Sequence, residues 1–449
     1  MQLTFFDMAS LVIAIAAIFG YINYRTLKLP FAIGITVAAL IASCAILAFD
    51  ALIPEVNVAQ TTSDMLHELN LTRVLMNGML SFLLFAGALH VDMDDLKAHK
   101  LPIMVLATIG VMISTVLVGF GSYGLFELLG IHVPLAYCLV FGSLIAPTDP
   151  VAVLGIMRAA GAAKDHEVKV VGESLFNDGI GVVVFTVLLA FAAGGDPHGA
   201  GAAAEGAHHA PMGAAGVFQL LGQEVIGGIG LGLIGGYVTY RAMRDMDEPN
   251  LEILFSVALV MGITVVALRL HFSAPLACVV AGLFIGNHGR TFAMSDRTQH
   301  ALDLVWHFID ELLNAVLFLL VGLEVVVISR EITGGSYLLA AVLMIPLALV
   351  ARLISVAVPV LSLRRYHGFA PGATAVLTWG GLKGGISVAL ALSLPEFEGR
   401  GAIVAATYFI VIFSIVVQGL TVGRLIEQLK RKVPIEDIEP PEAKASQSH

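Results

Sequence analysis

Charge is scarce in this sequence. Only 13% of the 449 residues are Asp, Glu, Lys or Arg, whereas 58% are hydrophobic, and the mean hydropathy is +0.90. Soluble domains usually contain about 25% charged residues. The shortage of charge therefore excludes an ordinary soluble protein and indicates a chain that crosses a membrane many times.

Cysteines and catalytic motifs are also few. Cys44, Cys138 and Cys278 stand alone in apolar segments, so they predict neither a disulfide framework nor a metal site. The sequence contains no HExxH zinc motif, no GxSxG nucleophile motif and no phosphate-binding loop. A GxGxxG pattern at 230–235 has no strand before it and favours close helix packing instead. We therefore expect no enzyme, no cofactor and no nucleic-acid partner.

Thirteen apolar windows are long enough to cross a bilayer. They lie at about residues 8–24, 30–49, 71–90, 102–128, 134–157, 166–193, 215–240, 250–270, 273–288, 302–328, 336–362, 371–394 and 402–424. An odd number of spans places the two ends of the chain on opposite sides of the membrane. Because Met1–Ser10 contains no Lys or Arg, the first window is expected to be a retained span rather than a cleaved signal peptide.

The Lys and Arg residues predict the orientation of these spans. If the N-terminus lies outside, 18 of the 24 Lys and Arg residues fall in cytoplasmic loops or at the C-terminal end, and four fall outside. Arg352 and Lys383 remain within the membrane. Cytoplasmic loops are enriched in Lys and Arg, so this distribution predicts an outside N-terminus and a cytoplasmic C-terminus.

Two segments outside the windows have distinctive compositions. The segment 194–213 is rich in Gly and Ala and contains His198, His208 and His209. This composition favours a flexible linker, and a loop that senses pH or binds a metal is the alternative. The acidic, Pro-containing segment 433–449 is expected to be a short disordered cytoplasmic tail.

A cluster of polar residues lies within the sixth window, at mid-membrane depth. On a helix, Glu173 and Asn177 lie one turn apart on one stripe, and Ser174 and Asp178 lie on the neighbouring stripe. An acid at the centre of a spanning helix costs about 2.5–3.5 kcal/mol on insertion scales, so such acids usually have a function. The alternative is a polar packing network between helices, but such networks generally use neutral Ser, Thr or Asn.

Two windows contain helix-breaking residues near their centres. The fifth contains Pro147 and Pro150 on either side of Asp149, and the twelfth contains Lys383 among four glycines. Proline removes amide donors, and irregular backbone at membrane depth survives only where protein buries it or where it lines a cavity. Asp149 can offset the positive N-terminal end of a half-helix, and Lys383 the negative C-terminal ends. Two interrupted helices in corresponding places predict a transporter built from inverted repeats.

These patterns predict an all-α polytopic membrane protein. We expect about 13 transmembrane helices in two inverted six-helix repeats, with the fifth and twelfth helices broken where they cross. The transmembrane domain would cover residues 1–432, with the first repeat at about 8–193, a linker helix at about 215–240 and the second repeat at about 250–424.

Arg352 lies within the eleventh window. An unpaired arginine in that position would be costly, so it should contact an acid. Glu173, Asp149 and Asp178 are the candidates. Glu324 lies nearer the outer end of its window, where water can reach it.

Four segments together resemble one family of transporters. Thr148–Val153 (TDPVAV) followed by Glu173–Asp178 (ESLFND) is similar to the monovalent cation/proton antiporter-1 family, which includes bacterial NhaP-type sodium/proton antiporters and eukaryotic sodium/hydrogen exchangers. Ala351-Arg352 and Trp379–Gly384 (WGGLKG) match further segments of the family in the same order. The resemblance covers essentially the whole membrane part of the chain.

The resemblance implies roles for individual residues. It implies an ion-binding site formed by Asp178, Ser174, Thr148 and Asn177. Asp178 would be the carboxylate that binds Na⁺, and Asn177 would also stabilise the crossing of the broken helices. Glu173 would pair with Arg352. The resemblance further implies a homodimer in the lipid of a bacterial inner (plasma) membrane, with a mobile six-helix core in each protomer.

Two positions differ from the pattern of the family. Some relatives carry an acid in the third helix where this chain has Ala86, so a ligand from that helix is in doubt. The family usually has arginine where Lys383 stands, and lysine lacks the planar, forked geometry of arginine. Both differences bear on ion preference and on the pH range of activity.

The predicted function is secondary active exchange of Na⁺ or Li⁺ for H⁺ by alternating access, with Asp178 binding either ion. Because Asn177 cannot carry a second proton, we expect electroneutral exchange of one cation for one proton. A K⁺/H⁺ antiporter of the same fold is the alternative. A cation channel would need a continuous polar pore and a filter loop, and the sequence has neither.

Overall fold

The computed structural model describes residues 5–53, 58, 60, 62–63, 78–193, 214–331, 335–365 and 368–432. Within these residues the chain is helical, and the only extended pairing is an isolated antiparallel bridge between Asp149 and Leu382. The predicted loop 194–213, with its three histidines, and the predicted tail 433–449 lie outside the described residues.

The elements follow one another along the chain in two series, separated by the segment 194–213. The first series contains α1 (Phe5–Ile22), η1 (Asn23–Leu27), α2 (Phe31–Leu52), α5 (Leu80–Leu89), α6 (Met93–Ala98), α7 (Lys100–Val105), η3 (Leu106–Gly110), α8 (Val111–Leu128), α9 (Leu135–Ile145), α10 (Val151–Ala159) and α11 (Lys164–Ala192). The second contains α12 (Ala214–Met243), α13 (Pro249–Leu270), α14 (Ala274–Phe284), η4 (Ile285–Gly289), α15 (Arg290–Ala293), α16 (Asp296–Leu323), α17 (Val325–Glu331), α18 (Gly335–Leu363), α19 (Ala373–Trp379), α20 (Gly385–Leu392), α21 (Arg400–Phe413), η5 (Ser414–Gln418) and α22 (Gly419–Lys432). The elements named η are single turns of π-helix.

Eight helices in the described part of the chain are long and apolar enough to span a membrane. Among the other predicted windows, 215–240 contains the unbroken 30-residue helix α12, and 273–288 contains α14 and η4. The remaining three contain short or interrupted helices, such as α9, and residues 71–77 of the third window lie outside the described residues. The fifth window is interrupted between α9 and α10, and the twelfth between α19 and α20, as the proline and glycine positions predict. The structure therefore confirms an all-helical, multi-span membrane protein.

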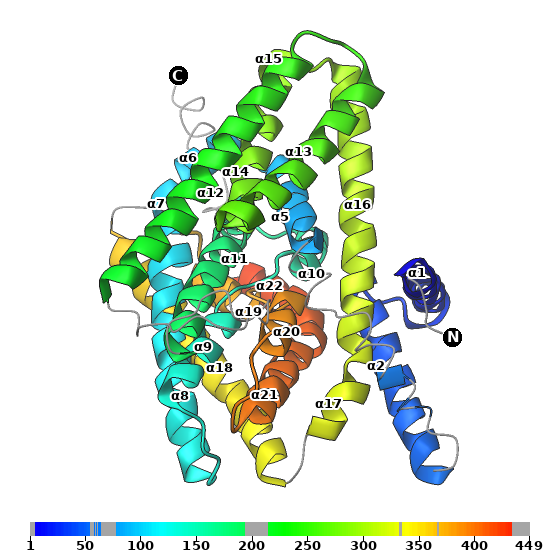
Figure 1. The fold of residues 1–449 in the computed structure, drawn as a ribbon, viewed down its shortest axis with the longest axis vertical. Helices are drawn as coiled ribbons and strands as arrows, with labels where there is room; N and C mark the ends of the chain where they lie inside the picture. The colour runs from blue at the N-terminus through cyan, green and yellow to red at the C-terminus, as the bar shows by residue number, and fades with distance from the viewer. Residues whose placement is uncertain are drawn as a thin grey trace.

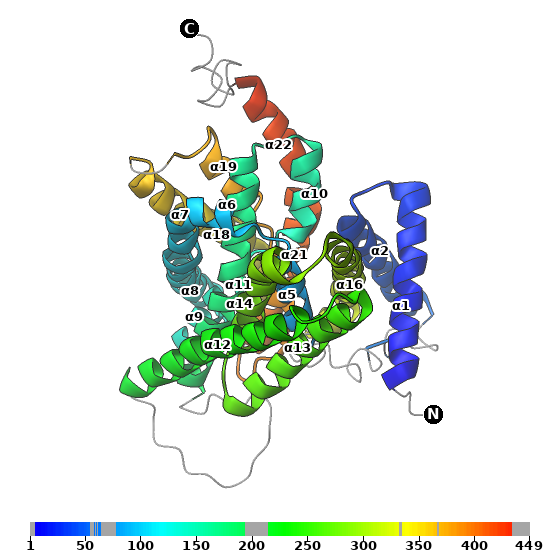
Figure 2. The same cartoon turned by 90° about the horizontal axis from the view of Figure 1, so that it is seen from above.

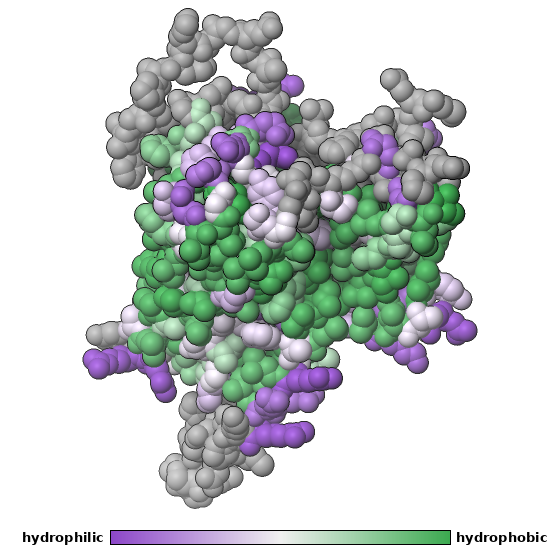
Figure 3. Space-filling model, turned by 90° about the horizontal axis from the view of Figure 1, so that it is seen from below, coloured by the Kyte–Doolittle hydropathy of each residue, from purple (hydrophilic) through white to green (hydrophobic). Residues whose placement is uncertain are grey.

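The outer surface is largely apolar. Large hydrophobic side chains stand exposed on many helices, including Phe6 on α1, Ile226 on α12 and Leu361 on α18. Figure 3 shows one face of the molecule on which hydrophobic residues form a broad area and hydrophilic residues gather toward the edges. In water such a surface would drive aggregation, whereas in a bilayer it contacts acyl chains.

Small residues allow neighbouring helices to pack closely. A Cβ added at Gly142 of α9 would lie 2.2 Å from the Thr115 carbonyl oxygen of α8. On α12, a Cβ added at Gly232 would lie 2.4 Å from the Ala277 carbonyl oxygen of α14. Gly228, Gly232 and Gly236, one turn apart, all face α14 or the residue before it, as expected for small residues between membrane helices.

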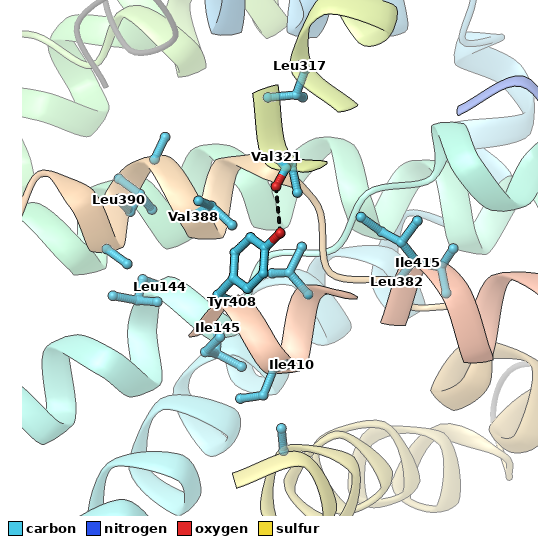
Figure 4. Packing of buried hydrophobic residues seen from close by; sticks show 14 of the residues in the cluster. Leu144, Ile145, Leu317, Val321, Leu382, Val388, Leu390, Tyr408, Ile410 and Ile415 are labelled. Carbon is cyan, nitrogen blue, oxygen red and sulfur yellow. Dashed lines mark hydrogen bonds between the residues drawn. The ribbon is translucent and has the colours of Figure 1, made fainter. Parts of the chain in front are cut away.

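The long helix α16 links the two ends of the bundle. Figure 1 shows it running beside α2 on one side and α20 on the other, and residue contacts connect it to both helices. Its last carbonyl groups cannot bond within the helix. The Tyr408 hydroxyl of α21 donates to the Val321 carbonyl (2.9 Å; Figure 4), and Ser43 of α2 donates to the Gly322 carbonyl (3.0 Å). Side chains from two other helices thus cap the C-terminal end of α16.

Contacts between loops fall into two groups that match the predicted sides of the membrane. Lys164 pairs with Asp95 (2.7 Å), and Lys430 donates to the Ala160 carbonyl (2.8 Å), which joins loops predicted to be cytoplasmic. In Figure 2, α10, α19 and α22 lie next to one another near this end of the molecule. Tyr137, near the predicted outer end of the fifth window, stacks on Phe397 of a loop predicted to lie outside, with ring centroids 3.8 Å apart.

The close packing of α8 and α9 makes a prediction about stability. Changing Gly142 to Ala should destabilise the protein by about 1–3 kcal/mol, because the added methyl group has to displace the α8 backbone. Thermal unfolding of the purified protein in detergent measures the effect. Gly124→Ala on α8 is the matched control, because a Cβ there meets no atom within 4 Å. Equal melting temperatures for the two variants would contradict the prediction.

Candidate functional site

The two broken helices meet at their interruptions. Between α9 and α10, Pro147 and Pro150 have no amide proton to continue the helical ladder. The second interruption runs between Trp379, which ends α19, and Gly385, which begins α20. The two segments approach so closely that a Cβ added at Gly384 would lie 2.7 Å from Cβ of Asp149. Only glycine allows this approach without a shift of the chain.

Hydrogen bonds between the two segments satisfy part of the interrupted backbone. The Asp149 amide donates to the Leu382 carbonyl (2.8 Å). The Lys383 ammonium donates to the carbonyls of Ala146 (3.0 Å) and Pro147 (3.2 Å). Both carbonyls follow α9, so the lysine supplies the donors that a continuing helix would have provided. Asp149 lies two residues before α10, where a carboxylate opposes the positive end of the helix.

Thr148 connects the first interruption to α11. Its hydroxyl lies 2.9 Å from the Ser174 hydroxyl and accepts a hydrogen bond from the Asn177 side-chain amide (2.8 Å). The Thr148 backbone amide donates to the side-chain oxygen Oδ1 of Asn177 (3.3 Å). Both ends of the Asn177 amide are therefore occupied by Thr148. This geometry suits a tether for the broken helix better than a ligand for an ion.

Asp178 lies next to this group of hydroxyls on α11. Its side chain is buried, and its Oδ1 atom has no hydrogen-bond partner among the described residues. Asp149, Lys383 and Glu173 are the charged groups that interact with it electrostatically. A buried acceptor without a donor is costly, and either a proton or a cation relieves that cost. Carboxylate and hydroxyl oxygens are the ligands that hard cations prefer.

Glu173 points toward a different partner. The Arg352 guanidinium of α18 makes a two-pronged contact with the Glu173 carboxylate, with Nη1–Oε1 at 2.5 Å and Nη2–Oε2 at 3.0 Å. The same Nη2 atom donates to the Leu377 carbonyl of α19 (2.9 Å). A Cβ added at Gly381 would lie 2.4 Å from Nη2, so the glycine makes room for the arginine. Of the three acids that the sequence offers, Glu173 is the one that contacts Arg352.

The structure thus brings the predicted residues together as two groups. Thr148, Ser174, Asn177 and Asp178 lie around the first interruption, and Asp149 and Lys383 lie where the two interruptions cross. Ala86 is buried on α5, where its methyl group provides no oxygen ligand.

Sequence reasoning missed two pairs of polar residues near this site. Asp310 and Asn314 of α16 are hydrogen bonded (3.1 Å), and Asp310 interacts electrostatically with Asp149. Ser414 and Gln418 belong to η5 and contact the second interruption. The rule that singled out Asp178, a polar side chain in an apolar window, would have found both pairs.

Comparison with known proteins shows extensive similarity. The family model described as "Sodium/hydrogen exchanger, transmembrane" matches residues 13–428. The chain is 42% identical over 438 residues to the Na⁺/H⁺ antiporter NhaP of Pseudomonas aeruginosa, covering 96% of this chain and 99% of that protein. It is 36% identical over 355 residues to the Na⁺/H⁺ antiporter NhaH of Halobacillus aidingensis, covering 78% of this chain and 81% of that protein.

A solved structure shares the fold. The sodium proton antiporter MjNhaP1 from Methanocaldococcus jannaschii superposes with a TM-score of 0.71 at 18% sequence identity, over 94% of this chain and 97% of that one. The family match covers nearly all of the chain, and the family is one of transporters rather than enzymes. The chain belongs to the sodium/hydrogen exchanger family of membrane transporters.

Proposed function

We propose that the protein exchanges Na⁺ or Li⁺ for H⁺ across the membrane by alternating access, with Asp178 as the carboxylate that binds either ion. The observation that carries the proposal is the buried Asp178 oxygen without a hydrogen-bond partner, beside the hydroxyls of Thr148 and Ser174. Loss of hydration favours a protonated acid, whereas oxygen ligands favour a bound cation. The names of the relatives, Na⁺/H⁺ antiporters, support the same activity.

The proposed architecture has 13 spans in two inverted six-helix repeats. The breaks at 146–150 and 380–384 support it, because they occupy corresponding places and pair antiparallel through Asp149 and Leu382. The helix α12 would join the repeats. A six-helix core would move against the other helices, which would hold a homodimer together in the lipid bilayer.

The proposed orientation has the N-terminus outside and the C-terminus in the cytoplasm of a bacterial cell. The bias in Lys and Arg supports it. Contacts between segments support the grouping of loops by side: Lys164 contacts Asp95 and Lys430 contacts Ala160, all assigned to the cytoplasmic side, whereas Tyr137 stacks on Phe397 and Gln223 donates to the Leu270 carbonyl at ends of spans assigned to the outside.

One carboxylate would carry the exchange. In this proposal Glu173 is held by Arg352 as a structural pair, and Asp149 is held at the start of α10. Asn177 is engaged by Thr148 and cannot carry a proton as a second aspartate would.

Exchange of K⁺ for H⁺ on the same fold is the alternative. Ala86 and Lys383, which differ from the pattern of the family, bear on which cation is preferred. No observation favours a channel.

The Glu173–Arg352 pair makes a prediction about stability. Glu173→Gln should lower the free energy of unfolding by about 3–5 kcal/mol, because it leaves the Arg352 charge buried without its partner. The double variant Glu173→Gln/Arg352→Gln should be more stable than the single variant. Thermal unfolding in detergent measures both. A fully stable Glu173→Gln protein that does not transport would place Glu173 in the ion site instead.

Asp178 should be indispensable for transport. Asp178→Asn should abolish Na⁺-dependent proton movement in proteoliposomes while leaving the melting temperature close to that of the original protein, because the amide keeps the shape but cannot exchange a proton for a cation. Asp94→Asn is the matched control, because the Asp94 side chain is 91% exposed on α6. Residual exchange by Asp178→Asn would show that another group carries the proton.

The exchange should not respond to membrane potential. If one proton replaces one monovalent cation, both loaded states have the same net charge. A potential of 100 mV, worth about 2.3 kcal/mol per elementary charge moved, then has no effect. The initial rate of Na⁺-driven proton movement in proteoliposomes should be the same with and without a potential set by valinomycin and K⁺. A rate that follows the imposed potential would require a second titrating group.

A further inference from the structure

The outer end of α16 lies between two sets of neighbours that hold it differently. On one side it packs against α2, and on the other it contacts α20 and α21. In alternating access, helices of a moving core slide past helices that do not move with it. The contacts on the two sides of α16 therefore indicate where such a movement occurs.

The junction between α16 and α2 is close and is fixed at several points. A Cβ added at Gly322 would lie 2.3 Å from Cβ of Ala39 and 3.0 Å from the Thr36 carbonyl oxygen. Ser43 of α2 donates to the Gly322 carbonyl (3.0 Å), and the Thr36 hydroxyl donates to the Phe318 carbonyl (3.4 Å). Backbones that approach this closely interlock, so we assign α2 and α16 to one rigid unit.

The helix α21 belongs with the crossing of the broken helices. It continues into η5, where the Ser414 hydroxyl accepts a hydrogen bond from the Lys383 backbone amide (2.9 Å). It also packs against α18 and α20. In Figure 4 the ring of Tyr408 lies among hydrophobic side chains of α9 and α20, such as Ile145 and Val388. In alternating access α21 would therefore move with the ion site, as part of the core.

The Tyr408 hydroxyl connects the core to α16. It donates to the Val321 carbonyl (2.9 Å), which is one of the last carbonyls before α16 ends at Leu323. Tyr408 and Val321 are both buried, at 5% and 0% exposed. A buried donor or acceptor that loses its partner is costly. The bond therefore favours the arrangement in which the outer ends of α16 and α21 are in contact.

We propose that the Tyr408–Val321 hydrogen bond is a latch that keeps the outer side of the interface between α16 and the core closed, and that it breaks when the core moves to open the site to the outside. The inference rests on the alternating access of the proposed function. It adds a device that sets the balance between the outside-closed and outside-open conformations, at a residue outside the proposed ion site.

Removal of the hydroxyl should open the outer side more often. Tyr408→Phe should increase the ratio of outside-open to outside-closed protein by about threefold to tenfold, as expected for the loss of one buried hydrogen bond. The measurement is the rate at which an impermeant maleimide, added outside, labels Leu317→Cys. Leu317 is 2% exposed and lies against Gly385 of α20 at the same interface. Cys44→Ala serves as the background, because Cys44 is exposed.

Ser43→Ala is the matched control. It also removes a hydroxyl that donates to a carbonyl at the end of α16, but both partners of this bond lie in the same rigid unit. It should lower the melting temperature and leave the labelling rate unchanged, whereas Tyr408→Phe should raise the labelling rate. A purely structural role for Tyr408 would give the two variants the same labelling rate.

Transport gives a second readout. In vesicles of known orientation, the half-saturating Na⁺ concentration is measured separately outside and inside. Tyr408→Phe should lower the ratio of the outside value to the inside value by about threefold to tenfold, because the apparent affinity on each side scales with the fraction of protein open to that side. Ser43→Ala should leave this ratio unchanged.

The labelling rates decide the outcome. A higher rate in Tyr408→Phe alone supports the latch. Equal rates in Tyr408→Phe and the unlatched background with Tyr408 intact would overturn the inference, and so would equal increases in Tyr408→Phe and Ser43→Ala. Labelling needs no transport, so the latch and the proposed exchange fail separately. A protein that moves no protons in response to Na⁺ would refute the proposed function, while the labelling rates still decide whether the latch exists.

Discussion

A polypeptide inside a bilayer has no water to hydrogen bond with its amide and carbonyl groups. Where the two broken helices cross, they supply part of these hydrogen bonds to each other. Each interruption exposes backbone groups that a continuous helix would satisfy. The Asp149–Leu382 backbone bond and the bonds from Lys383 to Ala146 and Pro147 make each break the partner of the other. Glycine is needed at position 384 because the two interrupted segments approach so closely there that a side chain would collide with Asp149. Neither break would be stable at this depth alone.

Buried charge is used in two different ways around the crossing. Both Glu173 carboxylate oxygens bond the Arg352 guanidinium, and Arg352 also bonds a carbonyl at the end of α19. Such a pair holds α11, α18 and α19 together and leaves little capacity for another ligand. Asp178 lies five residues further along α11, with an oxygen that no described residue engages. Both acids are buried, so depth does not distinguish them. They differ in their hydrogen-bond partners: Glu173 is paired with Arg352, whereas one oxygen of Asp178 has no partner among the described residues.

The tethers of the two breaks suggest how binding and movement are linked. Hydroxyl and amide side chains of α11 and η5 hold the irregular segments against the helices that follow them. Side-chain hydrogen bonds also connect α16 to its neighbours, for example from Tyr408 to the Val321 carbonyl and from Ser43 to the Gly322 carbonyl. In the proposed mechanism, a core whose site is tethered internally would move as a unit and keep its ion ligands, as alternating access requires.

The sequence by itself determined the membrane class, the position of both breaks and the identity of the polar cluster. It could do so because these features depend on local composition: apolar length, proline and glycine positions, and acids in apolar windows. It left open whether Arg352 contacts Glu173, Asp149 or Asp178, and it passed over Ser414, Gln418 and Asp310. Only the tertiary structure decided these points. A helix places Glu173 and Asp178 close together along the chain, but the direction from which α18, α19 and η5 approach α11 decides which of the two is paired, and that direction results from packing between distant segments.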